Sequence, residues 1–224
     1  MRRLPGDTIA AISTALGPAA IAVVRLSGEN AVAIGDTVFR GRRPLRDCRS
    51  HTVHHGHIVD AQGRDVDEVL ATVMLAPNTY TTEDMLELSC HGGSLPATRV
   101  LSVCLDAGAR QAGPGEFTER AFMNGRLDLV QAEAVADLIS ARTPRGLEQA
   151  LGQLEGALSS RLEALRDALT DMRATVEAAI DFPDETDPRA AREELAARAG
   201  ETCERVEQLL RDCDLGAAVR EGVT

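Results

Sequence analysis

The hydrophobic pattern of the chain changes character near its middle. Upstream of residue 113, short apolar runs are interrupted by Gly, Pro and Asn, whereas downstream apolar residues recur every three or four positions. Short interrupted runs are typical of strands, and the longer spacing is typical of amphipathic helices. The pattern therefore predicts an α+β protein, with a mixed α/β domain over residues 1–116 and an all-helical domain over residues 117–224.

The first half is expected to form a sheet with two helices. Residues 85–91 alternate most clearly, with Leu86, Leu88 and Cys90 on one face, which is typical of a strand with one buried side. The other expected elements are a hairpin of 52–59 and 66–75 around a turn at 60–63, strands at 7–13, 20–27 and 109–112, and helices at 29–39 and 95–107, the second ended by Gly108.

A junction follows the first half. Gly113-Pro114-Gly115 is a strong turn signal, and Thr118 is expected to cap a short helix that stops at Asn124-Gly125. Beyond it, an apolar stripe from Leu147 to Ala179 predicts one helix of about 50 Å at 1.5 Å per residue.

A second long helix is expected after the break at Phe182-Pro183. Asp187 is its expected cap, with Pro188 at the first helical position and a stripe from Leu195 to Cys213. Two striped helices joined by a short loop predict an antiparallel hairpin. Because a hairpin does not enclose a core by itself, we expect an incomplete bundle with an exposed apolar seam of several hundred Å².

Composition narrows the class of protein. The chain has 44% apolar and 26% charged residues, a net charge of −11 and a pI near 4.9, which indicate a soluble globular protein with little general affinity for nucleic acid. Residues 41–49 are expected to form a basic loop with four arginines. Five scattered cysteines without a CxxC pair, and no signal peptide or membrane-spanning run, indicate the cytoplasm. All 24 basic residues are arginine, so no phosphate-binding Walker A lysine is present.

Two charged residues interrupt apolar strands. Arg25 lies in the strand 20–27, and Glu87 lies between two leucines in the strand 85–91. A charge buried alone is costly, so each residue needs a partner. One interpretation is a structural salt bridge, of Arg25 with Glu87 or of either with another residue. The other is a small-molecule site, in which the carboxylate accepts two parallel hydrogen bonds and the arginine binds an acidic group.

Three further groups have plainer explanations. His51, His54, His55 and His57 are expected on an exposed polar face of the hairpin rather than in a metal site. Cys90 and His91 point to opposite faces of one strand and so do not form a catalytic dyad. The acidic residues 181, 184, 185 and 187 are explained by loop solvation and helix capping.

Four stretches together resemble the MnmE (TrmE) family of tRNA-modification GTPases. They are DTIAAIST with IAVVRLSG, YTTEDMLELSCHGG, PGEFTERAFMNGRLDLVQAEAVADLI and VEAAIDFPDE, in that order. The resemblance implies an N-terminal domain similar to the folate-binding domain of aminomethyltransferases. It implies that 5-formyl- or 5,10-methylene-tetrahydrofolate binds at Arg25, Glu87 and Arg126. Arg126 replaces the usual Lys, Thr82 replaces a Gly, and GPAA at 17–20 replaces a Gly/Arg-rich loop.

The resemblance also implies partners. Members of the family form homodimers and act with the flavoprotein MnmG to add an aminomethyl or carboxymethylaminomethyl group to C5 of the tRNA wobble uridine. Their GTP, Mg and K bind in a G domain that is expected to be missing here, because residues 220–224 stand where relatives run into the first G-domain strand. A fragment or truncated gene product is therefore expected, with no GTP hydrolysis and no catalytic residue. Two alternatives are a standalone folate-dependent one-carbon transferase and a dimerisation module with a vestigial pocket.

Overall fold

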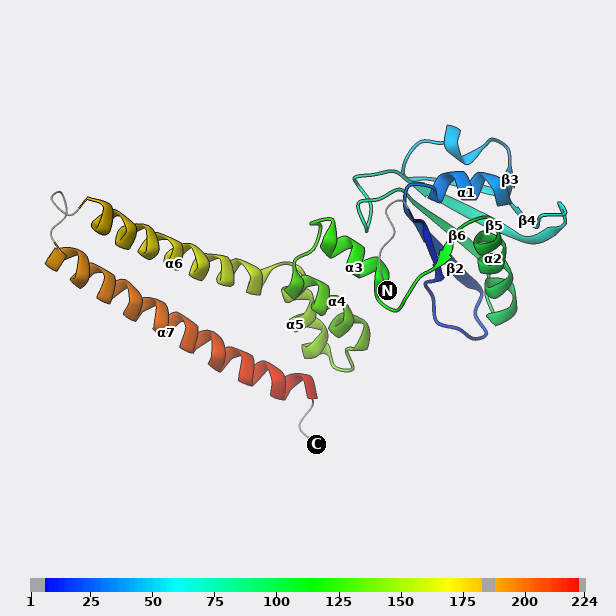
Figure 1. The fold of residues 1–224 in the computed structure, drawn as a ribbon. Helices are drawn as coiled ribbons and strands as arrows, with labels where there is room; N and C mark the ends of the chain where they lie inside the picture. The colour runs from blue at the N-terminus through cyan, green and yellow to red at the C-terminus, as the bar shows by residue number, and fades with distance from the viewer. Residues whose placement is uncertain (1–6, 183–187, 222–224) are drawn as a thin grey trace. The chain divides into compact units, whose positions relative to one another are not determined.

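The chain divides into two compact units, which we call the α/β unit (Met1–Arg126) and the helical unit (Leu127–Thr224). The computed structural model describes residues 7–182 and 188–221 (Figure 1). The division falls ten residues after the expected one at 116, so the α/β unit includes helix α3 (Glu116–Met123). The physical reason is that Arg120 of α3 forms ion pairs with Asp7 and Glu83 of that unit.

A seven-stranded sheet forms the centre of the α/β unit. Its strand order is β3-β4-β5-β6-β2-β1-β7, and neighbouring strands are antiparallel except the parallel pair of β1 and β7. The strands are β1 (Ile9–Ile12), β2 (Ile21–Ser27), β3 (Phe39–Gly41), β4 (Thr52–Val59), β5 (Asp65–Met74), β6 (Met85–His91) and β7 (Arg110–Gln111). The predicted hairpin is thus confirmed as β4 and β5.

Two helices pack on one face of this sheet, and we call the opposite face, where Ile21 and Leu70 are exposed, the open face. The helices are α1 (Ala31–Val38) and α2 (Ser94–Asp106), and α2 is followed by Gly108 at φ +111°, as the sequence predicts. The alternation in β6 places Leu86 and Leu88 in the core between sheet and helices, where both are fully buried. Glu87 therefore points to the open face, since successive side chains of a strand alternate.

Two local predictions in the α/β unit are wrong. Thr118 does not cap α3: the N-cap is Gly115, at φ +75°, and Thr118 lies within the helix. The residues 41–49 are not a plain loop, because they begin at the end of β3 and contain the 3-10 turn η1 (Leu45–Asp47).

The predicted long helix of the helical unit is also wrong, because the structure has two helices there. After α4 (Leu129–Ser140), α5 (Pro144–Leu154) and α6 (Ala157–Asp181) are separated at Gly156, whose φ is +90°. Gln131 of α4 donates a hydrogen bond of 2.9 Å to the Leu154 carbonyl, which holds the end of α5 against α4. The left-handed glycine lets the backbone change direction while the apolar spacing continues.

The antiparallel hairpin is confirmed for the next two helices. α7 (Pro188–Glu221) returns beside α6, and an ion pair of 2.8 Å joins Arg161 to Asp212. Leu165 and Leu209 are buried. The expected cap Asp187 and the acidic residues 184 and 185 lie outside the described residues. No helix in the described ranges is both long and apolar enough to cross a membrane.

Candidate functional site

The structure pairs the two charged residues that interrupt apolar strands. Arg25 of β2 lies directly opposite Glu87 of β6, and the Glu87 Oε1 atom is 2.8 Å from Arg25 Nε and 2.7 Å from Nη2. Each side chain remains about a quarter exposed, at 27% and 26%. Both contacts use one carboxylate oxygen, and Oε2 has no hydrogen bond to any residue in the described ranges. Glu87 therefore keeps an acceptor on the open face of the sheet.

An aromatic ring brings the third predicted residue to the same place. Tyr80, in the segment between β5 and β6, has its ring centroid 5.0 Å from the Arg126 guanidinium carbon and 5.6 Å from that of Arg25. The ring centroid of Phe117, in α3, lies 5.6 Å from the guanidinium carbon of Arg25. Arg25 and Arg126 thus both lie against the Tyr80 ring, and Glu87 joins this group through its ion pair with Arg25. At such distances a guanidinium is attracted to the ring face.

The two aromatic residues were missed by the sequence reasoning. Tyr80 lies between the predicted strands 66–75 and 85–91, and Phe117 lies in the predicted short junction helix; neither ring was predicted as a site residue. One signal could have pointed to Tyr80: it is the single tyrosine in a chain with only 2% aromatic residues. Its hydroxyl shares a hydrogen bond of 2.9 Å with the Thr118 hydroxyl, which fixes the loop to α3.

A network of ion pairs around two arginines supports this arrangement. Arg120 is 3% exposed and contacts the carboxylates of Asp7, Glu83 and Glu116, and Arg110 binds Asp7 and Glu116. Hydrogen bonds from Arg110 lower the pKa of Glu116 to about 2. Burial raises the pKa of Asp7, but hydrogen bonds from Arg110 and Arg120 outweigh burial, and the pKa lies below its usual value. The network joins the residues before β1, the β5–β6 segment and α3.

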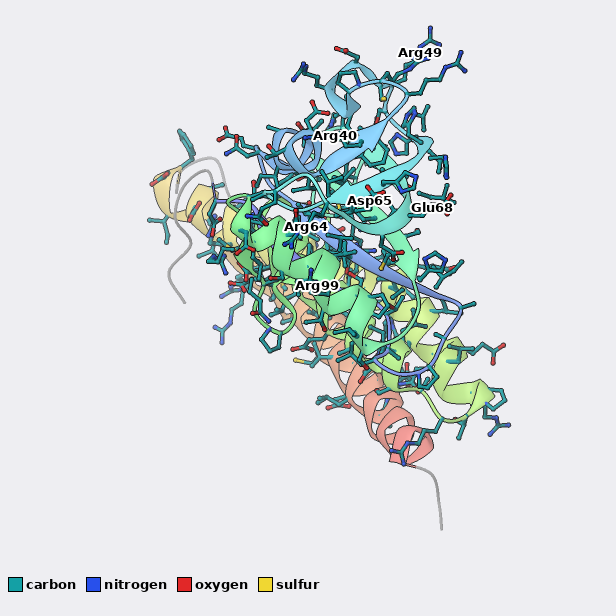
Figure 2. The ribbon with its side chains drawn as sticks, turned by 90° about the vertical axis from the view of Figure 1, so that its right-hand side faces the viewer. Arg40, Arg49, Arg64, Asp65, Glu68 and Arg99 are labelled. Carbon is teal, nitrogen blue, oxygen red and sulfur yellow. The ribbon has the colours of Figure 1, made fainter. Side chains whose placement is uncertain are left out.

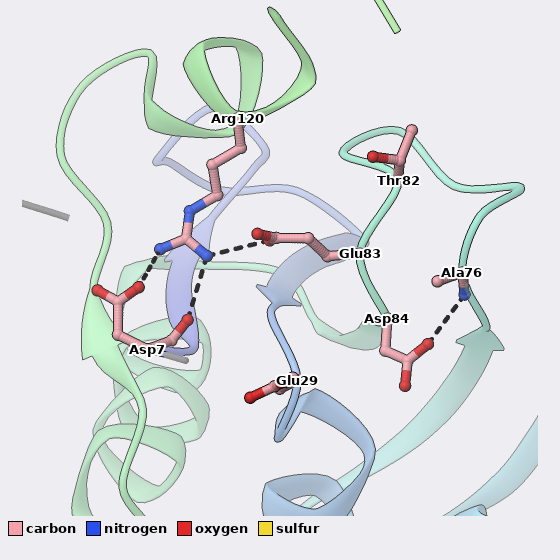
Figure 3. A pocket seen from close by; sticks show the side chains of 7 residues that line it. All are labelled: Asp7, Glu29, Ala76, Thr82, Glu83, Asp84 and Arg120. Atoms are coloured by element: carbon pink, nitrogen blue, oxygen red, sulfur yellow. Dashed lines mark hydrogen bonds and ion pairs between the residues drawn. The ribbon is translucent and has the colours of Figure 1, made fainter. Parts of the chain in front are cut away.

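A pocket of about 360 Å³ lies beside this network and not at the predicted site (Figure 3). Figure 3 shows Asp7 and Glu83 around the Arg120 guanidinium, with Glu29 and Asp84 across the pocket. The lining does not include Arg25, Glu87 or Arg126. Most of its charged groups are carboxylates, so the pocket does not suit an acidic ligand. At the predicted site, the side chains of Arg25 and Glu87 are about a quarter exposed.

Three histidines, His55, His57 and His91, lie farther along the open face, each near a carboxylate. His51 and His54 instead share hydrogen bonds with the hydroxyls of Ser50 and Thr52. His55 Nε2 is 2.6 Å from Glu68 Oε1, and His91 Nδ1 is 2.6 Å from Asp67 Oδ1. The bond with Asp67 raises the pKa of His91. Cys90 is buried and His91 is exposed, which confirms that the two side chains do not form a dyad. Within the described ranges, no group of three or more His, Cys, Asp or Glu is placed to hold a metal ion.

The fold is thus a mixed α/β unit followed by a helical unit, and comparison with known families accounts for both. The family model described as GTP-binding protein TrmE N-terminus matches residues 8–126, and the MnmE helical domain model matches residues 129–224. Together they cover nearly the whole chain. The chain therefore belongs to the MnmE (TrmE) family, as its sequence stretches predict.

Similar curated proteins are named tRNA modification GTPase MnmE. The chain is 50% identical over 226 residues to that of Geobacillus kaustophilus, 49% over 225 to that of Geobacillus thermodenitrificans, and 47% over 220 to that of Alkaliphilus metalliredigens. Each alignment covers 97% of this chain and 48% of the relative. The chain thus spans about half the length of the curated relatives it matches.

Proposed function

We propose that this chain is the folate-binding and assembly part of a tRNA-modification GTPase. In this proposal it binds 5-formyl- or 5,10-methylene-tetrahydrofolate, forms a homodimer, and acts in the cytoplasm with the flavoprotein MnmG on the wobble uridine of tRNA. The family membership and the name of the relatives support the assignment to tRNA modification. No GTP hydrolysis is assigned to these 224 residues, because they contain neither a lysine nor a GxxxxGK[ST] motif.

The observation that carries the folate proposal is that Arg25 and Arg126 lie against the Tyr80 ring and that Glu87 is paired with Arg25. A reduced folate has a pterin ring with an amino-pyrimidine edge and a tail that ends in carboxylates. The Glu87 carboxylate accepts hydrogen bonds from that edge, and its Oε2 atom is already open to the face where a ligand would lie. Arg126 binds a tail carboxylate in a bidentate manner.

The remaining residues of the site have supporting roles in this proposal. Arg25 orients the Glu87 carboxylate through its two contacts with Oε1, at 2.8 and 2.7 Å. Tyr80 and Phe117 form an apolar wall for the pterin ring. Exposed Ile21, Val53 and Leu70, at 61%, 57% and 47%, add apolar surface to the sheet unit and support its role in dimerisation.

Calorimetric titration with 5-formyltetrahydrofolate tests the site. We expect Glu87→Ala to weaken binding by roughly 1.5–3 kcal/mol, because the ligand loses a charged hydrogen-bonding partner. Arg126→Gln should also weaken binding, and Arg126→Lys should weaken it less, because lysine keeps the positive charge but loses the bidentate geometry. Glu68→Ala is the matched control, because it removes another exposed carboxylate of the same sheet.

The same titration separates the alternatives. Unchanged binding by Glu87→Ala would show that the site is assigned to the wrong residues. Transfer of the one-carbon unit to an amine acceptor would favour a standalone transferase. A stable dimer that binds no reduced folate would favour a dimerisation module with a vestigial pocket.

A further inference from the structure

The edge of the sheet carries a concentration of positive charge that the folate site does not use. Within residues 40–49 there are five arginines, Arg40, Arg42, Arg43, Arg46 and Arg49, and one acidic residue, Asp47. All five arginines are exposed. We call this surface the arginine edge. The arginine edge is positively charged, although the chain as a whole has a net charge of −11.

Most of this charge is not neutralised by the protein. Arg42, Arg43 and Arg49 make no ion pair with any residue that the structure describes. Arg46 approaches Asp36 at 3.5 Å but is 70% exposed, and Arg40 donates hydrogen bonds to the carbonyls of Thr37 and Phe39. By contrast, Arg25, Arg110 and Arg120 are paired with carboxylates. Unpaired exposed guanidinium groups in one segment remain available to an anionic partner.

The backbone that carries these side chains is held in place. Leu45 is fully buried and Cys48 is 7% exposed, so the segment is anchored in the core between its arginines. The Asp36 carboxylate accepts hydrogen bonds from the backbone N–H groups of Leu45 and Arg46, the second at 3.4 Å. Figure 2 shows Arg49 extending outward from this segment, with Arg40 on the neighbouring strand β3. Because the backbone is fixed, the ordering cost of binding is confined to the arginine side chains.

We propose that the arginine edge binds the phosphate backbone of RNA. Guanidinium groups bind phosphate oxygens in a bidentate manner, and several of them in one segment match a polymer of regularly spaced negative charges. Such contacts orient the RNA on the protein without reading its bases. The choice of RNA rests on the proposed role in tRNA modification. The arginine edge would then be a contact surface for RNA that is separate from the folate site.

The surface chemistry favours RNA over an anionic membrane. Segments that adsorb to membranes combine basic residues with apolar side chains that enter the lipid. Among residues 38–50, all of which the structure describes, no large apolar side chain is exposed, because Val38, Phe39 and Leu45 are buried. The arginine edge therefore has positive charge that an anionic lipid headgroup could contact, but it has no exposed apolar side chain to enter the lipid.

Fluorescence anisotropy with a labelled, unmodified tRNA transcript tests the proposal. The full chain is titrated between about 50 and about 200 mM salt, where phosphate contacts weaken steeply. We expect the triple variant Arg42→Gln, Arg43→Gln, Arg49→Gln to lose about 10–100-fold in affinity and its salt slope to fall by about two to three, because each phosphate contact contributes about one unit of slope.

A matched variant controls for net charge. Arg99→Gln, Arg142→Gln and Arg145→Gln also remove three exposed arginines and should leave affinity within about twofold. An equal loss in both variants, an unchanged triple variant, or no binding by the parent chain at low salt overturns the proposal. So does binding of vesicles of phosphatidylcholine and phosphatidylserine, lost in the triple variant, without binding of tRNA. Urea unfolding followed by Tyr80 fluorescence shows that the variants are folded, and folate titration of the same proteins tests the folate site separately.

Discussion

At the scale of single residues, Thr82 shows the cost of one side chain in an unfavourable conformation. Its φ is +60°, in the left-handed region, where β-branched residues are strained. The family pattern predicts Gly at this position, and the observed φ explains why glycine suits it. We expect Thr82→Gly to raise the free energy of unfolding by about 1 kcal/mol, because the strain relieved exceeds the extra chain entropy that glycine loses on folding.

Urea unfolding followed by Tyr80 fluorescence measures this effect in the α/β unit. The chain has one tyrosine and no tryptophan, so the signal comes from that unit alone. Thr82→Ala is the control: it removes the β-branch but keeps a Cβ in the left-handed region, so it should gain less. A lower urea midpoint for Thr82→Gly than for the parent chain would contradict the strain argument.

The site residues themselves were only partly accessible from the sequence. Arg25 and Glu87 were identified because a charge on an apolar strand is a local anomaly. Arg126 followed from the family pattern. Tyr80 and Arg120 have no such local signal: Tyr80 lies in a polar segment, and Arg120 in a short helix reads as an exposed polar residue. Arg120 is buried only because carboxylates from distant segments surround it, and a local pattern contains no information on such contacts.

At the scale of elements, the ion pairs of α3 make the stability of the α/β unit depend on pH. The pKa of Glu116 is about 2 in the folded protein, below its usual value, because Arg110 donates hydrogen bonds to it. A carboxyl with a lowered folded pKa stabilises above its unfolded pKa, and this stabilisation is lost as the pH falls through the folded pKa. We expect stability to fall between about pH 5 and pH 2, with Glu116 contributing roughly 2–3 kcal/mol.

Glu116→Gln tests this contribution by Tyr80-monitored unfolding across that pH range. The variant should be less stable than the parent chain at pH 7 and should approach it near pH 2, where the parent carboxyl is becoming protonated. Some pH dependence should persist, because the pKa of Asp7 is also lowered. Glu119→Gln, an exposed position on the same helix, should follow the parent curve. Parallel curves for Glu116→Gln and the parent chain would exclude the assignment.

The elements also show which patterns are informative. The strands and the β4–β5 hairpin were predictable because alternation with a period of two directly reports which face is buried. The break between α5 and α6 was not predicted, because the apolar spacing continues across Gly156. Apolar spacing reports burial, not the direction of the backbone, so the only local signal of the break was the glycine itself.

At the scale of the whole molecule, the sequence predicted the α+β class and the order of the two parts. The division between the units was the less predictable feature. A turn signal at residues 113–115 suggests a boundary, but α3 belongs to the α/β unit because of the contacts of Arg120. A boundary is a property of long-range contacts, and turn residues mark only where the chain bends.

The helical unit exposes apolar side chains that its own helices do not cover. Along α6, Leu162, Leu169 and Val176 are 44%, 56% and 42% exposed, and Leu210 of α7 is 60% exposed. Apolar residues exposed in a continuous row are unusual on a soluble monomer. We expect this seam to drive self-association through the helical unit. Light scattering after size exclusion should show a mass that rises with concentration, and hydrogen exchange should show stronger protection of α6 in the associated form.

Two double variants separate the seam from a general effect of charge. Leu162→Glu with Leu169→Glu places charges in the seam and should lower the associated fraction strongly, because burying a carboxylate without a partner is unfavourable. Ala164→Glu with Ala178→Glu adds the same charge at exposed positions of α6 outside the seam residues, and should not. A concentration-independent mass for the parent chain, with residues 147–212 as strongly protected as the α/β unit, would mean that the seam is already covered within one chain.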